Sequence, residues 1–160
     1  MPAVSRAEIV IDEPIAAVFS ELVDFGGWSR WMPALFRPAR GPARALAVAD
    51  RIVVLLGGAL PMALRVLRVA PHSELVWRGG MPGLLVGEHA FHLHDLGDGR
   101  TRVLSEERFS GLLAHIPGVQ SLVERSGTKA GAAMLAALAS SFVSSESSKT
   151  KARPALAERA

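Results

Sequence analysis

The fold is decided by residues 117–142, which read PGVQSLVERSGTKAGAAMLAALASSF. Proline is favoured in the first turn of a helix, so Pro117 marks a helix start. Apolar or small residues then recur every three or four positions, which places them on one face of a helix. This face consists of Val119, Val123, Gly127, Ala130, Met134, Leu138 and Phe142. The spacing predicts one helix about 39 Å long, enough to cross a small domain.

The middle of this predicted helix carries almost no side-chain volume. Gly127, Ala130, Gly131 and Ala133 interrupt a face that is bulky before them and again from Met134 onward. Small residues let a helix lie close to a sheet, because cores normally pack at crystal-like density. The same gap, facing a curved sheet, can instead leave an apolar void that holds a ligand. The helix alone leaves both interpretations open.

The chain before this helix is predicted to be mostly β-strand. A first strand over residues 4–11 precedes a short helix that begins after Pro14, and a turn or second short helix carries Trp28 and Trp31. Strand-like runs follow, separated by glycine and proline. They are residues 35–40, 51–56, 60–69, 73–78, 84–95 and 101–109. This order indicates an α+β fold, in which the long helix covers one face of an antiparallel sheet of six or seven strands.

The two tryptophans offer a further choice between a pocket and a core. Trp28 and Trp31 stand three residues apart, directly before Met32 and Pro33. Aromatic side chains at this spacing can line the mouth of a pocket or close the end of a hydrophobic core. Both interpretations stay open at this stage.

Composition and charge exclude several classes of protein. With 160 residues, of which 49% are hydrophobic and 21% charged, the chain is expected to form one globular domain. We expect this domain to span residues 1–143 and a disordered tail, rich in Ser, Lys and Glu, to span residues 144–160. The tail holds four basic and two acidic residues, so most of the net charge of +3 falls there. The nearly neutral domain lacks the basic surface that binds nucleic acid.

Motifs for other chemistries are also missing from the sequence. There is no cysteine, hence no disulfide framework or thiol chemistry. We find no phosphate-binding glycine loop and no nucleophile elbow, so we interpret the glycines as breaks between strands and expect no cofactor. No stretch reaches the ~18 apolar residues of a membrane span, and the amino terminus does not resemble a signal peptide. We therefore expect a cytoplasmic protein.

Several motifs together resemble one known family. The hairpin contains GEHAFHL at residues 87–93, GDGRTR at residues 97–102 and ERFSGLL at residues 107–113. Upstream stand LVWRG at residues 75–79 and WMP at residues 31–33. In this order the motifs resemble the polyketide cyclase/dehydrase and lipid-transport family, which belongs to the START and birch-pollen-allergen-like superfamily (SRPBCC). The resemblance covers about residues 3–143.

The resemblance implies a helix-grip fold, in which a curved antiparallel sheet wraps the long carboxy-terminal helix. Between them the family has a cavity for hydrophobic small molecules such as lipids, sterols or polyketides. Its members include carriers, cyclases, dehydratases and proteins that bind only other proteins, so the resemblance implies no shared catalytic residues. We expect the ligand-binding residues to be Trp31, Phe36, Leu55, Leu64, Trp77, His89, Phe91, Glu107, Phe109, Gly127, Ala130, Met134 and Leu138.

Two residues of the predicted hairpin are candidates for chemistry. Strand alternation puts His89 on the same face as Phe91, and Glu107 on the same face as Phe109. A five-residue turn would place Glu107 directly opposite His89, and a three-residue turn would place it diagonally. Such a pair could orient a ligand hydroxyl or transfer a proton, with Glu107 raising the pKa of His89. A purely structural polar pair is the alternative.

A metal site is not expected. His92 and His94 have a spacing that suits two ligands on one strand face, but that face should point to solvent and no third ligand is placed nearby.

The sequence thus favours a carrier or sensor of an apolar small molecule. A cyclase or dehydratase with His89 and Glu107 as acid and base is the second hypothesis, and a protein-interaction module without a ligand is the third.

Overall fold

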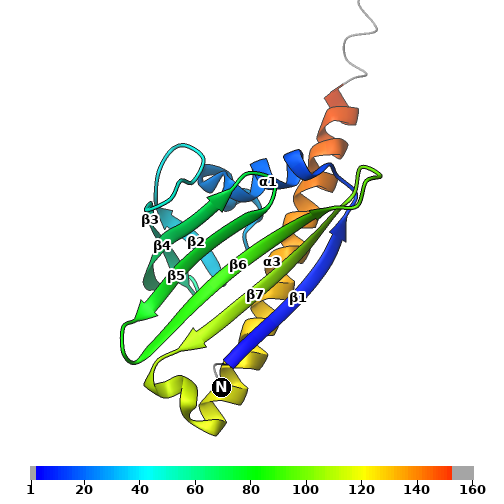
Figure 1. Ribbon diagram of the computed structural model, residues 1–160. Coiled ribbons are helices and arrows are strands. Elements are labelled where there is room, and N and C mark those ends of the chain that lie inside the picture. The colour runs from blue at the N-terminus through cyan, green and yellow to red at the C-terminus, as the bar shows by residue number, and fades with distance from the viewer. Residues whose placement is uncertain (1–2, 153–160) are drawn as a thin grey trace, which may run out of the picture.

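The computed structural model describes residues 3–152, which form one sheet, one long helix and several short helical segments (Figure 1). In chain order the elements are β1 (Ala3–Ile11), α1 (Ile15–Val23), η1 (Phe25–Gly27), α2 (Trp28–Trp31), β2 (Phe36–Arg40), β3 (Arg51–Leu56), β4 (Leu60–Ala70), β5 (Glu74–Met81), β6 (Leu85–Asp95), β7 (Thr101–Ser110), η2 (Leu112–His115) and α3 (Pro117–Ala152).

The strands form one antiparallel sheet of seven, in the order β1-β7-β6-β5-β4-β3-β2. Each strand after the first pairs with its neighbour in sequence, and β1 closes against β7 at one edge. In β6 the inward positions His89, Phe91 and Leu93 are buried, as expected, while His94 on the other face is exposed. The predicted α+β helix-grip architecture is confirmed.

The long helix α3 lies behind the sheet and packs mainly against β1 and β7 (Figure 1). It begins at Pro117, as predicted, but it continues to Ala152 rather than ending near residue 143. No proline occurs between Pro117 and Pro154, and Lys and Glu are good helix formers. Residues 153–160 of the expected tail lie outside the described residues. The division into a domain and a tail stays a prediction.

The hydrophobic core lies toward one end of the sheet, where residues 134–138 of α3 meet α1, α2 and the inner face of the strands. Its fully buried members include Leu22 of α1, Trp28 of α2 and Leu138 of α3. None of the helices within residues 3–152 combines the length and the hydropathy that a membrane span requires. The position of the core leaves the preceding turns of α3 to face a different part of the sheet.

Candidate ligand-binding cavity

One row of residues crosses the inner face of the sheet through β4, β5, β6, β7 and β1. The row consists of Val66, Trp77, His89, Glu107 and Ser5, each paired with the next. The hairpin of β6 and β7 closes with Asp95 opposite Thr101, so its turn has the five-residue length. His89 therefore stands directly opposite Glu107, the first of the two expected arrangements.

Space remains beside Glu107 because the neighbouring row of the inner face contains two glycines. This row consists of Leu64, Gly79, Gly87, Phe109 and Ala3. Gly79 and Gly87 pair across β5 and β6 and leave the middle of the inner face without side chains. A Cβ at Gly87 would stand 2.8 Å from Glu107 Oε1. These two glycines shape the site, so interpreting every glycine as a break between strands was wrong. The pairing of β5 with β6 is what would have indicated their role.

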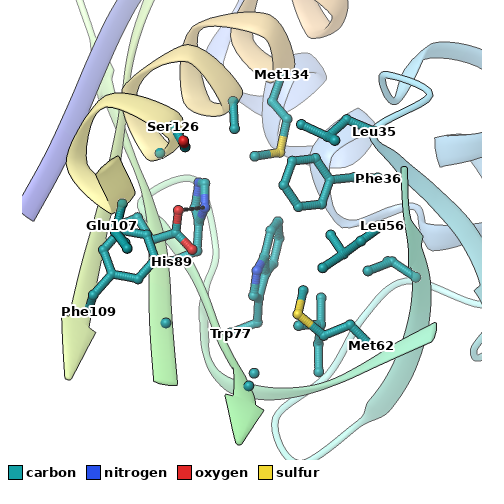
Figure 2. Close-up of a pocket in the computed structure, with 18 of the residues that line it drawn as sticks. Leu35, Phe36, Leu56, Met62, Trp77, His89, Glu107, Phe109, Ser126 and Met134 are labelled. Carbon is teal, nitrogen blue, oxygen red and sulfur yellow. Dashed lines mark ion pairs between the residues drawn. The ribbon is translucent and has the colours of Figure 1, made fainter. Parts of the chain in front are cut away.

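A cavity of about 440 Å³ lies between these rows and α3 (Figure 2). Most of the expected residues line it, namely Phe36, Leu64, Trp77, His89, Glu107, Phe109, Gly127, Ala130 and Met134. In Figure 2, Glu107, His89 and Phe109 lie on one side of the cavity, and Phe36, Leu56 and Met62 lie on the other. Leu35 and Leu122 also line it while remaining 48% and 59% exposed, so the cavity opens to solvent beside them.

Four of the expected residues do not line the cavity. Leu55 belongs to the opposite face of β3, because the alternation that turns Val54 inward turns Leu55 away. Trp31, Phe91 and Leu138 are buried in the hydrophobic core instead. The sequence did not separate core from cavity, because both are apolar positions on the same inner face.

Both tryptophans belong to the hydrophobic core, and one of them also lines the cavity. Trp28 lines the cavity, and its Nε1 donates a hydrogen bond to the Leu22 carbonyl oxygen at 2.9 Å. Trp31 packs against it, with ring centroids 6.4 Å apart, at the end of the core.

Other lining residues were missed by the sequence analysis. They are Met32, Leu35, Val54, Leu56, Met62, Gly79, Gly80, Leu85, Gly87, Leu122, Val123 and Ser126. Strand alternation would have found Val54, Leu56 and Met62. Leu122 and Ser126 lie beside the apolar stripe of α3, and nothing in the sequence indicated that the cavity extends past the stripe.

His89 is held in a fixed orientation on the cavity wall. Its ring stacks on Trp77, with centroids 5.1 Å apart, and its Nε2 lies 2.9 Å from Ser105 Oγ. The residue is 3% exposed, and this burial lowers its pKa from 6.5 to about 3. The expectation that Glu107 raises the pKa of His89 was wrong, because the desolvation of the imidazolium lowers this pKa instead. His89 is neutral near pH 7.

Among the described residues that line the cavity, Glu107 alone carries a carboxyl group. Its Oε2 lies 3.9 Å from His89 Nδ1, beyond hydrogen-bonding distance, and its side chain is 20% exposed. Burial raises the pKa of Glu107 from 4.5 to about 7. The pair is therefore a neutral imidazole beside a carboxyl group that titrates near neutral pH, and this carboxyl group can accept or donate a proton.

The histidines on the outer face do not form a metal site. His92 Nδ1 lies 3.5 Å from Glu74 Oε1, and His94 is exposed. Within the described part of the chain, no three His, Cys, Asp or Glu side chains gather as metal ligands would.

An antiparallel sheet that grips a long helix over an apolar cavity defines the helix-grip class of proteins. The chain belongs to the family described as polyketide cyclase/dehydrase and lipid transport, whose model matches residues 2–142. A comparison with curated protein sequences finds no match.

Solved structures share this fold at low sequence identity. A protein from Thermobifida fusca is 20% identical, with a TM-score of 0.69 and coverage of 86% of this chain and 91% of that one. A hypothetical protein from Helicobacter pylori is 19% identical, with a TM-score of 0.67 and coverage of 86% of both chains. The di-domain ARO/CYC protein BexL, from a biosynthetic pathway, is 15% identical, with a TM-score of 0.69. The match to BexL covers 84% of this chain and 44% of the BexL chain.

Proposed function

We propose that this protein binds an apolar small molecule in the cavity under α3. The observation that carries the proposal is the lining of the cavity, which is almost wholly apolar over about 440 Å³. This volume falls within the roughly 300–1,000 Å³ of typical ligand pockets. Water finds few hydrogen-bond partners in such a space, so an apolar molecule replaces it favourably. Membership of a family described partly by lipid transport supports the proposal.

The test is the uptake of Nile red, an uncharged dye that fluoresces in apolar surroundings. Ala130 is 7% exposed and lines the cavity, so Ala130→Trp is expected to fill the space and abolish the fluorescence increase. Ala133→Trp is the matched control, because Ala133 lies on the exposed side of the same helix. It is expected to bind the dye like the wild type.

The melting temperature of each variant shows whether it folds. Overpacking a core typically lowers stability by about 1–3 kcal/mol, which could unfold Ala130→Trp. In that case Ser126→Trp replaces it in the test. Ser126 is an exposed lining residue near the opening, so a bulky side chain there obstructs the cavity without entering the core. A folded variant of either kind that still takes up Nile red at wild-type affinity contradicts the proposal.

An enzyme of the cyclase or dehydratase type is the second candidate. The observation that favours it is Glu107, whose carboxyl group faces the cavity with a pKa raised to about 7. A group that titrates near the working pH is suited to acid–base catalysis. The likeness to BexL, an ARO/CYC protein, agrees with this candidate at the level of the fold.

Mass spectrometry of the bound molecule separates these functions. A carrier returns its ligand unchanged after incubation, whereas an enzyme returns a product, and Glu107→Gln then slows conversion by about 10²–10⁴-fold. A failure of the wild type to bind any apolar molecule favours the third hypothesis, a protein-interaction module.

A further inference from the structure

The polar side chains of the cavity are few, and they include no cation. Of the described residues on its wall, only His89, Glu107 and Ser126 carry polar side chains apart from the two indoles, and none is a lysine or an arginine. The indole Nε1 of Trp28 is already bonded to the Leu22 carbonyl oxygen. A buried anion needs a cation or several donors to replace its hydration. The wall offers an anionic ligand no positive charge.

His89 does not become that cation. Its ring is stacked on Trp77 and lies 4.6 Å from the Phe91 ring, so its environment is apolar. Its Nε2 is occupied by Ser105 Oγ at 2.9 Å. Burial lowers its pKa to about 3, so the ring is neutral near pH 7 and brings no positive charge to the wall.

Glu107, by contrast, has unused hydrogen-bonding capacity. Its Oε2 lies 3.9 Å from His89 Nδ1, which is too far for a hydrogen bond. The carboxyl group forms no hydrogen bond with any of the described residues. The carboxyl group lies beside Gly87, whose missing side chain keeps the space around Oε1 open. A half-buried carboxyl group in this position is stabilised by a donor that a ligand brings.

From this arrangement we infer that the cavity selects its ligand by charge. It accepts an apolar molecule that presents a hydroxyl or ammonium donor to Glu107, and it excludes the same molecule when it carries a carboxylate. The inference rests on the proposed function, because it specifies the ligand of the same cavity. A carboxylate would place a second negative charge beside Glu107 with no cation to balance either.

The experiment compares three molecules with the same decyl chain, namely decanol, decylamine and decanoate, as competitors of Nile red. At about pH 8 the carboxyl group of Glu107 is mostly ionised, because its pKa is about 7. We expect decanol and decylamine to displace the dye at concentrations at least tenfold below that of decanoate. In Glu107→Gln the ratio of the decanoate concentration to the decylamine concentration needed to displace the dye is expected to fall at least tenfold. Glu88→Gln makes the same chemical change on the outer face of β6 and is expected to keep the wild-type order.

A second variant tests the position of the charge. Gly87→Ala keeps Glu107 but puts a methyl group where a Cβ stands 2.8 Å from Oε1. It is expected to weaken decylamine binding severalfold while decanoate remains excluded.

The outcomes separate the inference from the proposed function. Equal displacement by all three decyl compounds, or an unchanged ratio of the decanoate to the decylamine concentration in Glu107→Gln, overturns the inference and leaves the proposed function standing. If Nile red does not bind and calorimetry detects none of the three compounds, the proposed function fails and this inference fails with it.

Discussion

Ser5 and Ser105 are inward-facing serines with the same burial, but only one of them is paired. Each is 2% exposed. Ser105 Oγ lies 2.9 Å from His89 Nε2, whereas Ser5 Oγ has no hydrogen-bond partner among the described residues. Ser5 stands beneath Gly127 of α3, where a larger group would not fit. A buried hydroxyl without a partner costs stability, since it loses its bonds to water.

The two serines therefore respond differently to the same substitution. Ser105→Ala leaves His89 Nε2 unpaired, and we expect it to lower the free energy of unfolding by about 1–3 kcal/mol. Ser5→Ala removes an unsatisfied hydroxyl, so it is expected to leave stability unchanged or to raise it. Urea denaturation of both variants measures the difference. Equal losses would mean that the contact between Ser105 and His89 contributes nothing to stability.

At the scale of elements, the small residues of α3 serve both purposes that the sequence left open. A Cβ at Gly131 would stand 2.8 Å from Ser105 Oγ and 3.5 Å from the Ala7 Cβ, so the helix lies close to β7 and β1 there. Gly127 has the same close approach, to Ser5 and the Phe109 ring, but it also lines the cavity together with Ala130. One side of this segment is tight packing and the adjacent side is the cavity wall.

This contact predicts the effect of adding a methyl group to α3. Alanine is favoured over glycine within a helix by about 1 kcal/mol, so propensity alone predicts that Gly127→Ala stabilises the protein. The close approach of Ser5 and Phe109 opposes this gain, and we expect the melting temperature to fall. Gly118→Ala is the control, because nothing lies within 4 Å of its added Cβ. Should Gly127→Ala raise the melting temperature as much as Gly118→Ala, the helix is not in close contact with β1.

The elements themselves were largely predictable, because each depends on a local pattern. The predicted strand over residues 51–56 is β3, and the runs that became β4 to β7 differ from the prediction by at most three residues at either end. The site was less predictable, because it depends on pairing between strands. Gly79 and Gly87 are eight residues apart, and only their pairing across β5 and β6 shows that they open one space. Whether Phe91 faced core or cavity depended on where α1 and α3 pack.

For the whole molecule, two buried groups impose opposite dependences of stability on pH. Glu107 has a folded-state pKa of about 7 against an ordinary 4.5, and His89 has about 3 against 6.5. As pH rises from about 4.5 to 7, the unfolded chain releases the Glu107 proton while the folded chain keeps it, so stability falls. As pH falls from about 6.5 to 3, the unfolded chain protonates His89 while the folded chain does not, so stability falls again. Between about pH 4.5 and 6.5 the two effects oppose each other, so maximum stability is expected in this range.

Glu107→Gln separates the contribution of Glu107 to the pH dependence of stability from that of His89. Gln does not titrate, so the variant keeps the contribution of His89 and loses that of Glu107. Relative to the wild type, its free energy of unfolding is expected to rise by about 1–3 kcal/mol between about pH 4.5 and 7.5. Urea denaturation of both proteins across this range measures the difference, with Glu88→Gln as the matched change on the outer face. A difference between wild type and Glu107→Gln that stays constant over the range would mean that the Glu107 carboxyl group keeps its hydration in the folded protein. The cavity wall would then be wet at this point, and the charge selectivity inferred for the cavity would lose its physical basis, because hydration would screen the repulsion of a bound carboxylate.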